Sequence, residues 1–435
     1  MTSEKTWFGH PRGLTVLFLT NMWEQFSYYG MRALLVYYMT KHLLLTQGTS
    51  SLIYGVYTAC AYFTPLIGGI IADRALGKKR AIIIGGSVMA LGHFMMTQEP
   101  LFYVALVTIA VGNGLFLPSL PSQIRDLYQP GDPRAARAYN VYYVGVNIGG
   151  VLAMLGCGTL GEVYGWHWGF GAAGVGMVFG LMVYLRGRRW LAPEPARSRA
   201  GTVTAPRSGM TGREKARLAF LIALIPVLML TIVGNQQFQN AYPLWSQKYM
   251  DLVLFGWQVP VTWLQAVDAV VSTATMLASI AFWRWWSTRR REPDELTKMA
   301  FGSILAAGGP ALLIIASGLI ESTHEKVSLV WTLGYTIVND LGFANILPVG
   351  LALYSRVAPK RLEGLVIGMY YLHLFLANTF VGWLAGFLEI MPSAQFWGLH
   401  AALVAGAGVL LLACRSLFGA VLAPQDEAAP ASAAT

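Results

Sequence analysis

Long apolar segments follow one another along almost the whole chain, and they restrict the fold more than any other feature of the sequence. A helix needs about 20 predominantly apolar residues to cross about 30 Å of hydrocarbon. With 55% hydrophobic and 12% charged residues among 435, the composition indicates a polytopic membrane protein and argues against a soluble enzyme. We predict twelve membrane spans, at 13–40, 51–73, 81–97, 101–125, 138–162, 168–185, 216–247, 261–286, 297–319, 326–355, 363–388 and 394–418.

The basic residues are distributed as expected for twelve spans with both termini in the cytoplasm. Short cytoplasmic loops collect Lys and Arg, whereas exported loops do not. In the predicted topology the exported loops hold only Lys41, Lys248 and Lys326. The net charge of +10 therefore reflects topology and contact with anionic lipid head groups, and we expect no nucleic-acid partner. The compact loops favour a bacterial inner (plasma) membrane.

A basic segment rich in Pro, Ser and Gly divides the chain into two halves. Residues 186–215 are predicted to form a flexible cytoplasmic linker between an N-terminal six-helix bundle, 1–185, and a C-terminal six-helix bundle, 216–420. The low-complexity tail, 421–435, is predicted to be disordered. Two six-helix halves around a site at the bilayer midplane are typical of proteins that work by alternating access. Since all twelve predicted spans are helices, we predict an all-α membrane protein.

The loop after the second predicted span carries a charged pattern. It reads Gly69-Ile-Ile-Ala-Asp73-Arg-Ala-Leu-Gly77-Lys-Lys-Arg80 and resembles the loop motif of the major facilitator superfamily, Gly-x-x-x-Asp-Arg-x-Gly-Arg-Arg, with one extra residue before Gly77. A carboxylate at a helix end beside a basic loop can pair with the neighbouring helix. We therefore predict Asp73 as a gating residue of the cytoplasmic side, while the basic residues there serve topology equally well.

The first span contains a polar stripe. Glu24, Tyr28 and Arg32 are four residues apart, and Asn21 continues the same helix face. Ionisable groups are costly within a membrane and usually functional, so we expect the stripe to face a cavity. The alternative is a helix-packing network without substrate contact.

The stripe belongs to a segment, Asn21-Met-Trp-Glu-Gln-Phe-Ser-Tyr-Tyr-Gly30, that resembles the signature Glu-x-x-Glu-Arg-Phe-x-Tyr-Tyr-Gly of the proton-dependent oligopeptide transporters. The resemblance extends over essentially all twelve spans. Further matching segments are Tyr62–Gly69 with Asp73, Gly112–Pro118, Tyr142–Gly149, Gly165–Phe170, Trp263–Gln265 and Pro348–Leu351. It implies the major facilitator fold, with twelve helices in two six-helix bundles, and peptides and protons as ligands.

The resemblance also implies roles for single residues. Arg32 would hold the carboxylate of the peptide. The other implied substrate-binding residues are Tyr28, Tyr29, Tyr62, Asn147, Gln237 of the seventh span and Tyr370, which stands where the family commonly has Trp.

Several departures from the family pattern change the charge of the predicted site. Three acids of the family are replaced, by Asn21, Gln236 and Phe343, and two bases, by Gln25 and Leu117, while Asp268 replaces an Asn. The net change is zero. Because removing one partner of a buried ion pair costs far more than replacing both, the changes indicate coordinated neutralisation rather than decay.

A zwitterionic peptide needs an opposite charge at each end, because burying an unpaired charge costs several kcal/mol. Arg32 and Asp268 supply these charges, so we assign the amino terminus of the peptide to Asp268; a structural carboxylate is the alternative. Proton-coupling candidates are Glu24 first, then Asp268 and Asp340. His93, His373 and His400 are interpreted as packing residues, with His373 worth testing because it lies near Tyr370.

The sequence thus favours a proton-coupled symporter that imports di- and tripeptides by alternating access. The alternatives are a weakly coupled or uncoupled facilitator of peptides or related small zwitterions, and a peptide sensor that does not transport. We do not expect an enzyme, because neither Gly-x-Ser-Gly nor His-Glu-x-x-His contexts occur in the spans. Cys60, Cys157 and Cys414 show no metal-ligand spacing, so we expect no metal and no cofactor apart from the coupling proton. We expect a monomer in the lipid bilayer.

Overall fold

The computed structural model describes residues 9–129, 132, 134–193, 210–358 and 362–422. Most of the predicted linker and nearly all of the predicted tail lie outside these residues, so both assignments stay predictions. The first half contains α1 (Arg12–Tyr37), η1 (Tyr38–His42), α2 (Gln47–Ile71), η2 (Ala72–Leu76), α3 (Lys78–Met95), η3 (Glu99–Leu101), α4 (Phe102–Arg125), α5 (Arg134–Thr159), η4 (Leu160–Tyr164), α6 (Trp166–Gly187) and η5 (Arg188–Trp190).

The second half is also helical, apart from one short hairpin. It contains α7 (Gly212–Thr231), α8 (Val233–Gln237), α9 (Ala241–Tyr249), β1 (Val253–Leu254), β2 (Trp257–Gln258), α10 (Thr262–Ser287), α11 (Glu295–Ala306), α12 (Gly308–Thr323), α13 (Val330–Phe343), α14 (Leu347–Val357), α15 (Glu363–Ala385), η7 (Gly386–Glu389) and α16 (Ser393–Leu422). The two strands pair antiparallel, with Val253 opposite Gln258.

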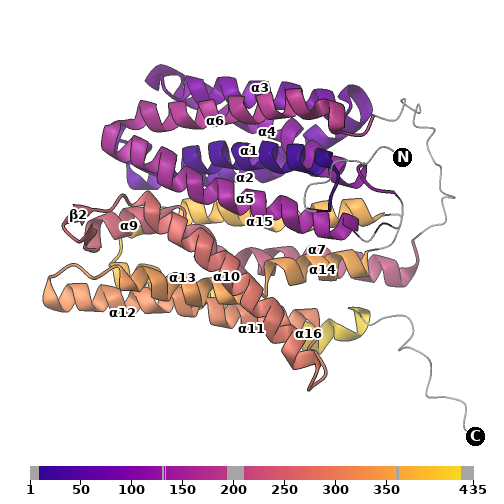
Figure 1. Cartoon of the computed structure of the whole chain (residues 1–435). Helices are drawn as coiled ribbons and strands as arrows, with labels where there is room; N and C mark the ends of the chain where they lie inside the picture. The colour runs from indigo at the N-terminus through magenta and orange to yellow at the C-terminus, as the bar shows by residue number, and fades with distance from the viewer. Residues whose placement is uncertain (1–8, 130–131, 133, 194–209, 359–361, 423–435) are drawn as a thin grey trace, which may run out of the picture.

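The helices form two groups that lie side by side (Figure 1). Helices α1 to α6 make one group and α7 to α16 the other, and α2 packs along α15 while α5 packs along α10. The approach of α2 to α15 requires glycine. A Cβ atom on Gly55 would lie 2.4 Å from the carbonyl oxygen of Asn378 and 2.7 Å from the Cα atom of Gly382.

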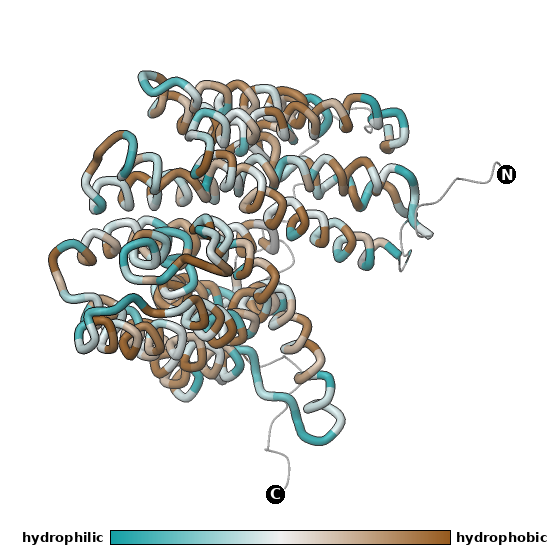
Figure 2. Tube along the Cα trace, turned by 60° about the vertical axis from the view of Figure 1, so that its left-hand side comes forward, coloured by the Kyte–Doolittle hydropathy of each residue, from teal (hydrophilic) through white to brown (hydrophobic). Residues whose placement is uncertain are grey.

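The helices have the apolar character of membrane spans, which confirms an all-α membrane protein. In the described part of the chain, nine helices are long and apolar enough to cross a bilayer. Figure 2 shows apolar residues along the helices and polar ones gathered in the loops. Three predicted spans are not among the nine: α1 carries the polar stripe, α3 begins with three basic residues, and α7 to α9 are interrupted. The count of twelve therefore stays a prediction.

The segment with the extra residue before Gly77 differs in helix type from α2, which precedes it. The segment η2 is a π-helix, in which the amide of Gly77 donates to the carbonyl of Ala72, five residues earlier, at 2.7 Å. This π-turn forms the end of the helix, and α3 begins directly after Gly77. The side chain of Asp73 on this turn is exposed.

We call the end of the bundle that carries the basic loops, including Lys78 and Arg356, the basic end, and the other the opposite end. At the opposite end the two halves are joined by two carboxylates. Glu162 accepts hydrogen bonds from the amides of Val261 and Thr262, both at 2.9 Å, at the start of α10. Glu389 accepts from the amides of Gln47 and Gly48, at 2.8 and 3.2 Å, at the start of α2.

Further contacts between the halves lie at the same end. The hydroxyl of Tyr37 donates to the carbonyl of Pro243 at 2.6 Å, and the indole of Trp263 donates to Thr159 at 2.8 Å. Asn240 donates to the carbonyl of Ser51 at 3.2 Å. The opposite end is therefore closed by contacts between the halves.

Candidate functional site

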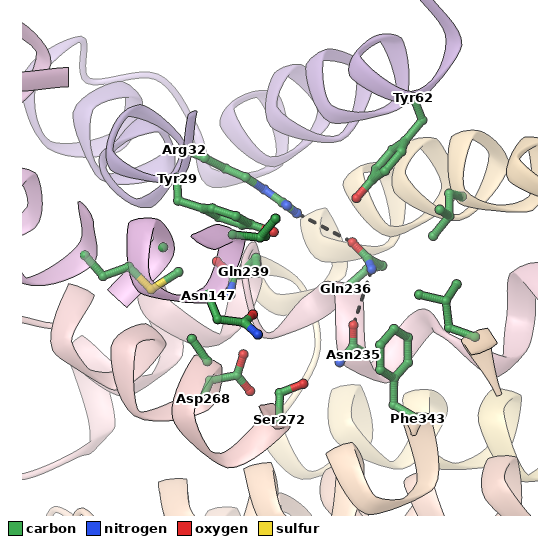
Figure 3. Close-up of a pocket in the computed structure, with 16 residues that line it drawn as sticks. Tyr29, Arg32, Tyr62, Asn147, Asn235, Gln236, Gln239, Asp268, Ser272 and Phe343 are labelled. Carbon is green, nitrogen blue, oxygen red and sulfur yellow. Dashed lines mark hydrogen bonds between the residues drawn. The ribbon is translucent and has the colours of Figure 1, made fainter. Parts of the chain in front are cut away.

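A cavity of about 230 Å³ lies between the two halves. Its lining comes from α1, α2 and α5 on one side and from α8, α10, α13, α14 and α15 on the other. Figure 3 shows Tyr29, Arg32 and Tyr62 on one wall, with Asp268 and Ser272 on the facing wall. The polar lining residues are Tyr29, Arg32, Tyr62, Asn147, Asn235, Gln236, Gln239, Asp268 and Ser272.

Arg32 is held against aromatic side chains on the wall of the first half. Its Nε donates to the hydroxyl of Tyr54, and its guanidinium lies 5.4 Å from the ring centroid of Tyr54 and 6.0 Å from that of Tyr28. Among the described residues it forms no ion pair with a carboxylate. Its charge is therefore available to an anionic group in the cavity.

The second half approaches Arg32 through an interrupted seventh span. Helix α7 ends at Thr231, and the short α8 and the turn after it place Asn235, Gln236 and Gln239 at the cavity. Interrupted helices place backbone and polar side chains at the midplane of many transporters. The Nη2 of Arg32 donates to Oε1 of Gln236 at 3.5 Å.

Two carboxyl groups face each other behind this turn. Asp268 on α10 lines the cavity, and its carboxyl group lies within hydrogen-bonding range of that of Asp340 on α13. Oδ1 of Asp340 also accepts from Nδ2 of Asn235 at 3.4 Å. Its Oδ2 is buried and accepts no hydrogen bond from the described residues. A proton shared by the two carboxyl groups would supply a partner for it and would remove the like-charge repulsion between them.

Only part of the predicted stripe on α1 reaches the cavity. Glu24 is buried inside the first half, where Nε2 of Gln25 donates to its Oε2 at 2.6 Å, and it does not line the cavity. Asn21 donates to the carbonyl of Tyr142 at 3.3 Å. Tyr28 packs partly buried against the apolar core of the first half. Arg32 thus faces the cavity, whereas Glu24 and Asn21 face neighbouring helices.

Two residues predicted to bind substrate also lie away from the cavity. Gln237 is fully buried in the second half, where its Nε2 atom lies 2.9 Å from Nε2 of His400. Successive residues on a helix point about 100° apart, so Gln237 and its neighbour Gln236 face different directions. Gln236 takes the cavity-facing position instead. The hydroxyl of Tyr370 donates to the carbonyl of Leu347 at 2.5 Å, which ties its ring to α14.

The remaining predicted residues lie apart from the cavity as well. The Nδ1 atoms of His373 and His400 each lie within hydrogen-bonding distance of a backbone carbonyl one helical turn earlier, and both side chains are buried. Neither nitrogen of the buried His93 has a partner among the described residues. Asp73 lies at the basic end, and the described residues form no ion pair with it.

Sequence reasoning missed three of the polar lining residues, Asn235, Gln239 and Ser272. A signal for each of them was present. The run Asn235-Gln236-Gln237-Phe238-Gln239 is the most polar part of an otherwise apolar span, which indicates a wet cavity rather than lipid. Ser272 is one helical turn after Asp268 and therefore shares its face.

Comparisons with known proteins agree with this architecture. A model described as the POT family matches residues 79–207 and 208–397. An uncharacterised transporter of Bacillus subtilis (strain 168) is 30% identical, and a peptide transporter of Yersinia enterocolitica is 28% identical; each alignment covers 94% of both chains. A crystal structure of a peptide transporter in complex with sulfate superimposes with a TM-score of 0.87 at 26% identity, covering 96% of this chain and 97% of that one.

Proposed function

This chain belongs to the POT family, and from that premise we propose that it is a proton-coupled symporter that imports di- and tripeptides by alternating access. The observation that carries the proposal is the pair of opposite charges on the two walls of the cavity. Arg32 comes from the first half and Asp268 from the second, so a zwitterion bound to both holds the halves together.

The charged and polar groups of this cavity suit a short peptide. The carboxylate of a short peptide binds Arg32, and its ammonium group binds Asp268, with Asn147, Gln239 and Ser272 available to the peptide amides. Tyr29 and Tyr62 supply aromatic surface to side chains. Relatives named as a peptide transporter and as di-/tripeptide transporters support this substrate class.

The charges of the site suggest how a proton is coupled. Arg32 carries one positive charge, and Asp268 and Asp340 together carry two negative charges when ionised. One shared proton makes this set neutral, which favours passage of the loaded site through a closed, water-poor state. Glu24 is a further proton site that acts through α1, because it lies on the same helix as Arg32 but outside the cavity.

We also infer the orientation and the surroundings of the protein. The basic end faces the cytoplasm, so both termini are cytoplasmic, and Asp73 acts there when the cytoplasmic side closes. Closure at the opposite end then makes the structure an inward-facing state. The membrane is the bacterial inner (plasma) membrane, and the working unit is a monomer.

An uncoupled facilitator is the second candidate. The observation that favours it is the neutral surroundings of Glu24, which hydrogen-bonds to Gln25 and has no ion pair among the described residues. A facilitator would equilibrate peptide across the membrane and would not respond to a proton gradient.

Reconstituted protein separates these functions. We expect labelled dialanine to accumulate in liposomes above its external concentration when an inward proton gradient is imposed, and to leak out when an ionophore collapses the gradient. Equilibration without accumulation would indicate the facilitator. Binding without uptake would indicate a sensor and would contradict transport altogether.

A further inference from the structure

Two amide side chains connect the charges of the cavity. Nη2 of Arg32 donates to Oε1 of Gln236 at 3.5 Å, and Nε2 of Gln236 donates to Oδ1 of Asn235 at 3.3 Å. Nδ2 of Asn235 then donates to Oδ1 of Asp340 at 3.4 Å. We call the side chains of Gln236 and Asn235 the amide bridge, and Figure 3 shows its first two hydrogen bonds.

The amide bridge has one direction. Each amide turns its carbonyl oxygen toward Arg32 and its NH₂ group toward the carboxyl pair of Asp340 and Asp268. A bound peptide presents the same polarity, with an anionic group at the arginine, amides between, and a donor group at the carboxylate. The amide bridge therefore resembles, in charge order, the zwitterion that the site is proposed to bind.

An empty carrier needs such a substitute. To begin another cycle it must change conformation without substrate, which encloses Arg32 and the carboxyl pair in a water-poor interior. A buried charge or polar group without a partner costs free energy there. The amide bridge gives each of them a neutral hydrogen-bonding partner in the absence of peptide.

We propose that Gln236 and Asn235 are positioning residues that act as a built-in surrogate for the substrate and permit the empty carrier to reorient. This inference rests on the proposed transport function. The hydrogen bonds of the bridge, at 3.3 to 3.5 Å, are longer than the usual N–H···O distances of about 2.7–3.2 Å. A peptide carboxylate and ammonium form shorter, charge-assisted bonds and displace the bridge.

The inference predicts that two modes of transport separate. Net uptake requires return of the empty carrier, whereas exchange of external labelled for internal unlabelled peptide does not. Replacing Gln236 with Met keeps the side-chain length but removes both hydrogen bonds. We expect Gln236→Met to lower net uptake of dialanine at least roughly tenfold while exchange changes by less than about twofold.

Two more variants make the test specific. Asn235→Leu breaks the bridge at its other member, so it should show the same separation, and the double variant should be no worse than either single one. Gln265→Leu removes a buried amide of α10 that does not line the cavity, and its ratio of net uptake to exchange should equal that of the wild type.

The outcomes distinguish the inference from the function on which it rests. Absence of dialanine exchange in the wild type would refute the proposed function itself. Exchange in the wild type together with equal losses of both modes, or no loss, in Gln236→Met and Asn235→Leu would refute the surrogate role. Both rates are measured per folded protein, and Asn235→Leu decides the matter if Gln236→Met does not fold.

Discussion

Asp268 is the residue on which recognition of the peptide ammonium group depends in this account. It lines the cavity opposite Arg32 and shares a hydrogen bond with Asp340. The proposed clamp thus uses one charge from each half. This arrangement ties the binding of a zwitterion to the approach of the two walls.

Asp268→Asn should weaken binding of dialanine roughly 10- to 100-fold, because hydrogen bonds to charged groups contribute about 1.5–3 kcal/mol. Binding of N-acetyl-dialanine, which lacks the ammonium group, should be weak in the wild type and should not weaken further in the variant. Calorimetry on purified protein measures both. Equal losses for the two ligands would contradict the assignment.

Glu24→Gln tests the proton site outside the cavity. The variant keeps the shape and the contact with Gln25 but cannot exchange a proton, so gradient-driven accumulation of dialanine should fall about tenfold or more, with dialanine affinity unchanged within about twofold. Accumulation in liposomes and calorimetry provide the two values. Full accumulation in the variant would remove Glu24 from the coupling mechanism.

The sequence predicted the kinds of residue in the cavity better than which residue of each helix faces it. Tyr29, Arg32, Tyr62, Asn147 and Asp268 line it as the pattern suggested. Gln237 does not, because α8 is a short separate helix whose rotation about its axis depends on packing against α15 and α16. The helix is rotated so that Gln236, and not the next residue Gln237, faces the cavity. Local sequence does not reveal tertiary packing of this kind.

At the scale of elements, the carboxylates at the opposite end form a symmetrical pair. Glu162 follows α5 and contacts the start of α10, while Glu389 follows α15 and contacts the start of α2. Helices α5 and α15 are the fifth predicted spans of their halves, and α2 and α10 the second. Each half therefore contributes one carboxylate that accepts hydrogen bonds at a helix N-terminus of the other half, where backbone amides and the helix dipole favour an anion.

Glu162→Gln and Glu389→Gln should each favour opening of this end, because a neutral amide loses the charge-assisted part of these bonds. We expect each variant to shift the open-to-closed ratio roughly tenfold, from about 1.4 kcal/mol. Spin labels at the exposed residues Leu44 and Ile390, on a background without native cysteines, report the distance between the two halves at this end by electron paramagnetic resonance. An unchanged distance distribution in the double variant would contradict a latch role.

The N-terminus of α11 gives a pH prediction outside the membrane. The carboxylate of Asp294 accepts from the amide of Thr297 at 2.9 Å and from Arg415 at 2.6 Å. Partial burial opposes its charge, but these hydrogen bonds outweigh burial and lower the pKa of Asp294. Because the folded pKa is depressed, the stabilisation is present above the unfolded pKa of about 3.9 and is lost as the pH falls through the folded pKa.

Asp294→Ala should therefore lower the stability of the protein near neutral pH by about 0.5–1 kcal/mol, at the lower end for a cap because the side chain is partly exposed. The difference from the wild type should shrink below about pH 4. Thermal unfolding in detergent over a pH series measures it. A difference that stays constant down to pH 3 would exclude the charge as its cause.

Other elements show where sequence reasoning reaches its limit. The long apolar helices follow from hydropathy alone, and the extra residue before Gly77 was visible in the motif. The π-turn at this place was not predicted, because local sequence does not distinguish a π-turn from an insertion in the loop. The interruptions at Ile232 and between Phe343 and Leu347 likewise depend on packing between helices.

At the scale of the whole molecule, the cavity, the closed opposite end and the amide bridge describe one state of a cycle. The loaded site, with a zwitterion and one shared proton, is neutral, whereas the empty site without that proton carries one negative charge. Return of the empty carrier then moves a negative charge outward. In the proposed cycle, the carboxyl pair thus imports one positive charge with each peptide, and a proton carried by Glu24 would add a second.

The most direct test of proton-coupled symport is the charge moved per peptide. In proteoliposomes without a pH gradient, with labelled dialanine outside, an inside-negative voltage should drive accumulation, and the ratio of charge to peptide should be at least about one, because the carboxyl pair carries one proton per neutral zwitterion. Uptake that moves no charge and ignores the voltage would contradict the account.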